Sequence, residues 1–169
     1  MSSLNRNVPV IVLTAQVLNE AEMMRLNHGV ARVLAKGMFT IPETLAHVGA
    51  ALARNQKMGG ETQRLVRKAM AYIHTHYADA ITRKDIARYT NVNEDHLTHS
   101  FQQELGLSPV AYITRYRIQQ AKQLLTRGNL NITAVAQAVG IFDSDYFSRV
   151  FRQETGVSPR EYRRHANKP

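Results

Sequence analysis

Polar and charged side chains that can donate or accept hydrogen bonds recur in two stretches of the sequence, fifty residues apart. The first contains Asp95, Thr98 and His99, and the second contains Ser144, Asp145 and Arg149. Arginine can donate two hydrogen bonds to guanine O6 and N7, whereas a carboxylate can only accept, for example from cytosine N4. The formal net charge of +9 favours a polyanionic partner, although a basic surface that only maintains solubility is the alternative explanation of charge alone.

Other chemistries find little support in the residue types. The chain has no cysteine, which excludes disulfides and thiolate metal sites. His74 and His76 would point to different faces of a helix, and His96 and His99 lack acidic co-ligands at zinc spacing. No nucleophile motif, phosphate-cradling glycine-rich loop or carboxylate pair is evident. We therefore expect no metal, no cofactor and no enzymatic activity.

The N-terminal residues and the apolar segments bear on location. No apolar run is long enough to cross a membrane. The start of the chain, MSSLNRNVPVIVLTA, lacks a basic region followed by a long apolar region and a cleavage site. The expectation is a cytoplasmic protein with no membrane partner.

A repeated pattern organises the second half of the chain. Residues 101–112 read FQQELGLSPVAY and residues 151–162 read FRQETGVSPREY. Between residues 98–112 and 148–162, seven of fifteen aligned positions are identical. Each copy predicts a short helix, a tight turn, a second helix and a third helix that starts at a Ser-Pro pair. This is the helix-turn-helix pattern, and two copies on a basic chain favour nucleic-acid binding far more than one copy would.

Local signals set the boundaries of these helices. The predicted helices are 62–77, 83–89, 94–105, 109–127, 132–139 and 144–155, followed by a last helix that Ser158-Pro159 opens. Asn93, Asn131 and Asp143 are predicted N-caps, and Gly106, Gly128, Gly140 and Gly156 are predicted ends. The core-facing side chains are expected to be Leu97, Phe101 and Leu105 in the first copy and Tyr146, Phe147, Val150 and Phe151 in the second. The polar residues between them are expected to face outward.

The helix between the copies suggests how two grooves could be read. Eighteen residues from Pro109 to Thr126 would span about 27 Å. Adjacent major grooves on one side of B-DNA lie about 34 Å apart, so one chain could reach two of them. Phosphate contacts are expected from Arg83, Lys84, Gln102, Arg115, Arg117, Ser148 and Arg152, with Lys122 and Arg127 as further candidates. A solvated basic face is the alternative for about half of the basic residues on this helix.

From about Leu65 to His165, the chain resembles the DNA-binding domain of the AraC/XylS family of bacterial transcription regulators. The motifs are KDIARYTNVNEDHLTHSFQQELGLSPVAYITRYRIQQAKQLL and NITAVAQAVGIFDSDYFSRVFRQETGVSPREYR. The resemblance implies two helix-turn-helix subdomains on one long helix. It also implies that Asp95, Thr98, His99, Ser144, Asp145 and Arg149 touch base edges, and that activation is the more common outcome.

Two features depart from the family pattern. The second turn carries Gly140-Ile141 in place of Gly-Phe, and we expect Phe142 to replace part of the missing ring. Two reading positions are aspartates, Asp95 and Asp145, which also lie in the first turn of a helix. A carboxylate there stabilises the helix, so a structural role is an alternative to base reading.

The first fifty residues have an α/β pattern. Strands are predicted at 9–14 and 30–36, and helices at 19–27 and 41–54. LNRNVPVIVLTA and GVARVLAKGMFTIPETLAHVGAAL resemble the second half of a response-regulator receiver domain, with Thr14 and Lys36 at its phosphate-contacting positions. The strands that would carry the acidic pocket are missing, and Lys36-Gly37 replaces the usual Lys-Pro. The segment could be the remnant of a longer regulator or a homodimerisation element.

The predicted fold is mainly α, with two tandem helix-turn-helix subdomains joined by a long linker helix and preceded by a partial α/β segment. The predicted domains are 1–54, a linker at 55–61, and 62–167. Within the last domain, the helix-turn-helix units are 82–106 and 131–156, on either side of the helix 109–127. The predicted function is sequence-specific binding of double-stranded DNA in transcription regulation. The alternative is a protein-interaction module, for example for RNA polymerase, with vestigial DNA binding.

Overall fold

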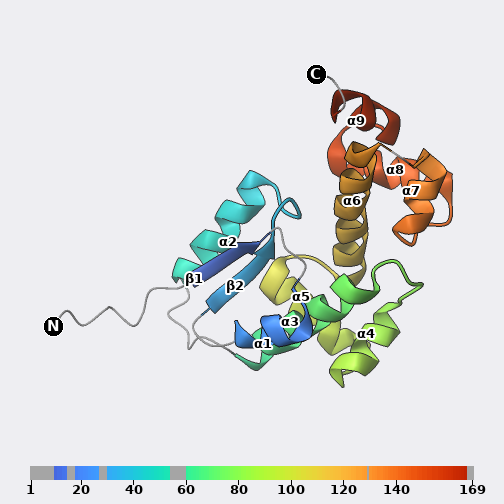
Figure 1. Ribbon diagram of the computed structural model, residues 1–169. Helices are drawn as coiled ribbons and strands as arrows, with labels where there is room; N and C mark the ends of the chain where they lie inside the picture. Colours follow the sequence, from blue (N-terminus) through green and yellow to red (C-terminus); the bar gives the residue numbers. More distant parts are fainter. Residues whose placement is uncertain (1–9, 15–17, 27–29, 54–59, 129, 167–169) are drawn as a thin grey trace. The chain divides into compact units, whose positions relative to one another are not determined.

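The computed structural model describes residues 10–14, 18–26, 30–53, 60–128 and 130–166 (Figure 1). In chain order its elements are β1 (Val10–Thr14), α1 (Glu20–Arg25), β2 (Val30–Ala35), α2 (Ile41–Ala53), α3 (Glu61–His76), α4 (Arg83–Thr90), α5 (Glu94–Leu105), α6 (Pro109–Arg127), α7 (Ile132–Ala138), α8 (Ser144–Thr155) and α9 (Pro159–Ala166). The fold is mainly α with a small parallel sheet near the N-terminus, which confirms the predicted fold class. Pro9, Asn27, Arg54 and most of the predicted linker lie outside the described residues. No helix in the described part is long and apolar enough to cross a membrane.

The chain divides into two compact units. The first unit comprises the described residues up to Thr75 together with Arg83–Pro109, and the second comprises His76–Thr82 together with the residues from Val110 onward. In this division the α/β segment shares a unit with the first helix-turn-helix, and the domain boundaries 1–54 and 62–167 stay predictions. The short connector 76–82 joins α3 to α4, yet its contacts are those of the second unit.

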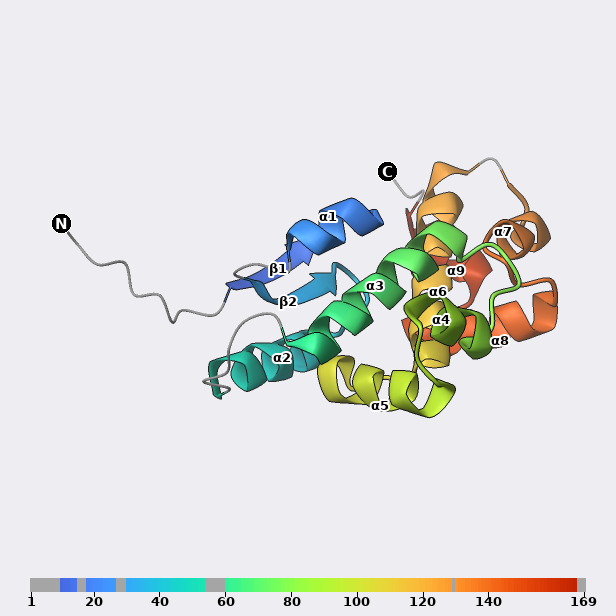
Figure 2. The same cartoon turned by 90° about the horizontal axis from the view of Figure 1, so that it is seen from below.

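The first unit begins with a βαβα segment. β1 and β2 pair in parallel, and Figures 1 and 2 show α1 and α2 on opposite sides of this sheet. A capping box starts α1: Asn19 Oδ1 accepts from Glu22 N over 2.9 Å, and Glu22 Oε2 accepts from Asn19 N over 2.9 Å. Met23, Val33 and Leu34 are buried, so this segment contributes apolar side chains to the core of the first unit.

The second unit packs α7, α8 and α9 with α6 around one apolar core (Figure 1). The core residues are Ile118, Ala121, Leu125, Val135, Ala136, Val139, Ile141, Phe147, Val150 and Phe151. Tyr77 of the connector and Tyr162 of α9 pack against this cluster. The aromatic spacing within α8 therefore places its apolar face inward and leaves its polar face for other contacts.

The two turns between the paired helices share one geometry. Asn91 and Gly140 both have positive φ, at 60° and 76°. Val92 N donates to Ala87 O over 3.0 Å, and Ile141 N donates to Ala136 O over 2.9 Å. Asparagine and glycine are the residues that adopt this left-handed conformation most readily. The repeat in the sequence is thus a repeat in backbone structure.

Two expectations for the second copy were wrong. Ile141 fills the core position at 4 % exposure, but Phe142 is 71 % exposed and replaces no missing ring. Tyr146, expected in the core, is 41 % exposed. Phe142 precedes α8, and Tyr146 lies in the first turn of this helix, which Asp143 caps. Adjacent residues in such a turn point in different directions, so only one of Ile141 and Phe142 can enter the core.

Candidate nucleic-acid interface

The helices α5 and α8 present equivalent polar faces. Asn93 Oδ1 accepts from His96 N over 2.7 Å, and Asp143 Oδ1 accepts from Asp145 N and Tyr146 N over 2.9 Å. Gly106 and Gly156, whose backbones both adopt the left-handed conformation, end the two helices. Each helix therefore starts and stops at matching positions. The fully buried inward pairs are Leu97 with Phe147 and Phe101 with Phe151.

The face opposite these aromatic and aliphatic side chains carries the predicted base-reading residues. Asp95, His99, Asp145 and Arg149 are exposed, and Thr98 and Ser144 are half-buried. Arg149 lies over the Tyr146 ring, with its guanidinium carbon 5.5 Å from the ring centroid. Ser144 Oγ donates to Thr133 Oγ1 of α7 over 3.3 Å. The structure thus brings each predicted trio onto one exposed helix surface.

In the first module, a polar cluster braces the start of α5. Arg83 Nε pairs with Glu94 Oε2 at 2.7 Å, and Arg83 Nη1 donates to Thr98 Oγ1 over 3.4 Å. Thr98 Oγ1 in turn donates to the Glu94 carbonyl over 2.8 Å. The Thr98 hydroxyl proton is thereby committed to its own helix, which leaves this oxygen an acceptor. Arg83 therefore links α4 to α5, and its phosphate contact stays a prediction.

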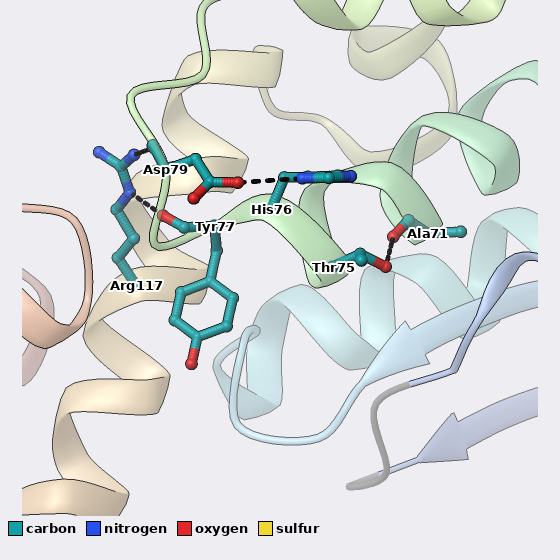
Figure 3. Close-up of polar contacts among 6 residues, drawn as sticks. All are labelled: Ala71, Thr75, His76, Tyr77, Asp79 and Arg117. Carbon is teal, nitrogen blue, oxygen red and sulfur yellow. Dashed lines mark hydrogen bonds and ion pairs between the residues drawn. The ribbon is translucent and has the colours of Figure 1, made fainter.

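The arginines of α6 also make contacts inside the protein. Arg117 Nε and Nη2 donate to the carbonyl oxygens of Tyr77 and Asp79, each over 2.8 Å (Figure 3). Burial lowers the pKa of Arg117. Arg115 Nε pairs with Glu154 Oε2 of α8 at 3.2 Å. These contacts favour structural roles for Arg115 and Arg117 over the predicted phosphate contacts.

The remaining phosphate candidates differ in exposure. Lys84, Gln102, Arg127 and Arg152 are exposed, Ser148 is half-buried, and burial lowers the pKa of Lys122. Sequence reasoning overlooked Arg160 and Arg164, which are exposed on α9. The basic residues that follow the second Ser-Pro pair in the sequence could have indicated them. Ser158 Oγ and N both donate to Glu161 Oε2, over 2.7 and 2.8 Å, and these bonds lower the pKa of Glu161 and secure the start of α9.

Metal chemistry finds no support in the described part of the chain. No group of three or more histidine, aspartate or glutamate side chains there is arranged to hold an ion. The two helices offer hydrogen-bond donors and acceptors on exposed surfaces and no enclosed reaction site. Such an arrangement can recognise the edges of bases.

Comparison with known proteins also identifies a helix-turn-helix domain in the helical region. A family model described as a helix-turn-helix domain matches residues 86–165. The uncharacterized HTH-type transcriptional regulator YijO of Escherichia coli is 33 % identical over 149 residues, which is 88 % of this chain and 50 % of YijO. The arabinose operon regulatory protein of Escherichia coli is 38 % identical over 112 residues, which is 66 % of this chain and 38 % of that protein. The chain thus spans half or less of the length of these relatives.

A solved structure agrees with the fold. The C-terminal domain of AraT, a response regulator from Geobacillus stearothermophilus, is 34 % identical with a TM-score of 0.59. The likeness covers 63 % of this chain and 88 % of that domain.

Proposed function

The chain belongs to the AraC family of helix-turn-helix regulators, and we propose that it binds double-stranded DNA at specific sequences to regulate transcription. The observation that carries the proposal is the duplicated geometry of α5 and α8. Both helices have a capped start, a glycine end, a buried aromatic residue at the same position and polar side chains on the opposite face. Two such surfaces on a chain of net charge +9 suit a nucleic-acid ligand.

The roles within the interface follow from side-chain chemistry. Arg149 has the exposure and the donor geometry to bind guanine O6 and N7. Asp95 and Asp145 are acceptors that suit cytosine N4, and the Thr98 oxygen can accept because its proton is used within α5. Lys84, Gln102, Ser148 and Arg152 are proposed to contact phosphates, joined by Arg160 and Arg164. Phosphate contacts orient the protein without selecting sequence.

We further propose that α5 and α8 read adjacent major grooves. The helix α6 has 19 residues and rises about 28 Å. Adjacent grooves lie about 34 Å apart, so a helix of this length suits the task. Activation through contact with RNA polymerase is the regulatory outcome that the family resemblance favours. This function places the protein in the bacterial cytoplasm.

A selection from random double-stranded DNA at near-physiological salt tests the proposal. Two enriched blocks about one helical turn apart are expected. One enriched block would mean that one module reads bases while the other holds phosphates. Absence of enrichment, with binding that disappears as salt rises, would contradict sequence-specific recognition.

A second candidate function is a protein-interaction module. The exposed carboxylates of Asp95 and Asp145 favour it, because both lie on the reading faces and repel phosphate. Under this alternative, DNA affinity is weak and the helical surface binds a protein such as RNA polymerase. This alternative would be excluded if the chain bound one selected sequence with high affinity and this affinity fell steeply as the salt concentration rose.

The α/β segment is also proposed to pair two copies of the chain. Leu13 of β1 and Ile41 and Leu45 of α2 are exposed apolar side chains on this segment. Sedimentation equilibrium of the whole chain tests the pairing. We expect a dimer that Leu45→Glu dissociates, with Leu130→Glu, an exposed position in the second unit, as the control.

A further inference from the structure

Two buried arginines link the α/β segment to α3 and to α5. Arg67 of α3 donates through Nη1 to the carbonyl of Leu26 over 2.7 Å, and its Nη2 donates to the carbonyl of Val30. In the opposite direction, Arg32 of β2 donates through Nη1 to the carbonyl of Glu104 over 2.7 Å. Arg32 is 7 % exposed and Arg67 is 4 % exposed. Both guanidinium groups are therefore committed to contacts within the first unit.

The Glu104 carbonyl lies in the last turn of α5, the helix that carries Asp95, Thr98 and His99. Carbonyls in the last turn of a helix have no partner within it. The Gln102 carbonyl accepts from Gly106 N over 3.0 Å, which is the ordinary local solution. The Glu104 carbonyl instead accepts from Arg32, 72 residues earlier in the chain. A cation at this end of a helix also interacts favourably with the helix dipole.

The position of Arg32 is itself determined by the α/β segment. Its Nη1 also contacts His47 Nδ1 of α2, so β2 and α2 hold the guanidinium together. A small cavity of about 20 Å³ lies at this contact, lined by residues of β2, α3 and α5. That volume is close to the size of one water molecule.

The two ends of α5 are held by different parts of the chain. Asn93 and the Arg83–Glu94 pair hold its start from within the helix-turn-helix. Arg32 holds its end from outside. We propose that the α/β segment is a positioning arm for the first reading helix, acting through Arg32 on the Glu104 carbonyl. The expected effect on DNA recognition rests on the proposed DNA-binding function, whereas the effect of Arg32 on the end of α5 can be tested without DNA.

Hydrogen exchange of the whole chain is the first test. In wild-type protein at low urea concentrations, amides of β2 and of the last turns of α5 are expected to open together, as one cooperative unit. Arg32→Met removes the donor at similar side-chain length. We expect it to speed exchange in the last turns of α5 roughly tenfold. The control is Arg64→Met, at an exposed position on α3.

The effect on DNA binding is measured with two derivatives of the selected sequence, each of which has one of its two blocks scrambled. Arg32→Met should weaken binding through the block read by α5 roughly tenfold and leave the block read by α8 unchanged. If Arg32→Met does not fold, the wild-type exchange pattern decides: separate opening of β2 and α5 overturns the proposal. Wild-type exchange at α5 in a folded Arg32→Met variant also overturns it. Failure of the wild-type chain to select DNA would refute the proposed function and leave the exchange result valid.

Discussion

Arg117 on α6 donates from Nε to the carbonyl of Tyr77 over 2.8 Å and from Nη2 to the carbonyl of Asp79 over 2.8 Å (Figure 3). One guanidinium group thereby fastens the connector 76–82 within the second unit. Tyr77 also packs edge-on against Tyr116, with ring centroids 5.4 Å apart. The connector is thus held by side-chain packing and by two charge-assisted hydrogen bonds.

Replacing Arg117 should destabilise the protein. Arg117→Met leaves two carbonyl oxygens of the connector without their donor, and we expect a loss of roughly 1–3 kcal/mol in the free energy of unfolding. Arg127→Met, at an exposed position on the same helix, is the control and should change stability by less than about 0.5 kcal/mol. Urea denaturation followed by circular dichroism measures both. Equal midpoints for the two variants would show that the connector does not depend on Arg117.

Gly140 is required both for its backbone conformation and for the space around it. Its φ is 76°, and a Cβ atom there would lie 2.7 Å from the Ala78 carbonyl oxygen of the connector. Gly156 has a similar φ of 81° but no atom within 4 Å of the corresponding position. Gly156→Ala should therefore cost about 1–2 kcal/mol from the left-handed conformation alone. Gly140→Ala should cost clearly more in the same denaturation experiment, and an equal cost would contradict the steric argument.

Arg149 is expected to select a base. Arg149→Ala should weaken binding to the selected sequence by roughly 1–3 kcal/mol and have little effect on random DNA. Lys84→Ala is the matched comparison. It should weaken binding to all sequences alike and reduce the salt slope by about 1. Fluorescence anisotropy at several salt concentrations separates the two patterns. A uniform loss for Arg149→Ala would identify Arg149 as a phosphate contact.

The Arg83–Glu94 pair permits a clear test of bracing against phosphate binding. If Arg83 braces α5, then Arg83→Met and Glu94→Gln should both weaken binding to the selected sequence, because each removes the 2.7 Å ion pair. If Arg83 contacts phosphate, then Glu94→Gln should strengthen binding, since it frees the guanidinium and removes a negative charge. We expect both variants to weaken binding. Anisotropy titrations at one salt concentration distinguish the outcomes.

Buried His74 should make stability depend on pH. Burial lowers the pKa of His74 from 6.5 to about 4, so the unfolded chain takes up a proton at a higher pH than the folded chain does. Stability should therefore fall as the pH drops from about 6.5 to about 4, by at most roughly 3 kcal/mol from this group. Urea midpoints of wild type and His74→Gln across this range provide the measurement. The same pH dependence in both proteins would mean that other groups cause it.

The boundaries of the recognition helices could be predicted from the sequence because their signals are local. The caps at Asn93 and Asp143 bond to backbone groups two or three residues away, and Gly106 and Gly156 end their helices by their own conformation. The alternation of polar and apolar residues then determines which face is exposed. Asp95, Thr98, His99 and Arg149 therefore lie where the sequence predicted. Their contacts with DNA remain predictions.

The partners of the arginines depend on tertiary structure. Arg83, Arg115 and Arg117 resemble exposed basic residues in the sequence, yet each contacts another element of the protein. Arg32 reaches a carbonyl 72 residues away, and no spacing rule encodes such a pair. A long flexible side chain reveals its partner only when packing has brought distant segments together. By itself, the sequence determined which helices form and which faces they expose, because these depend on neighbouring residues. Only the tertiary structure decided that the α/β segment holds the end of α5.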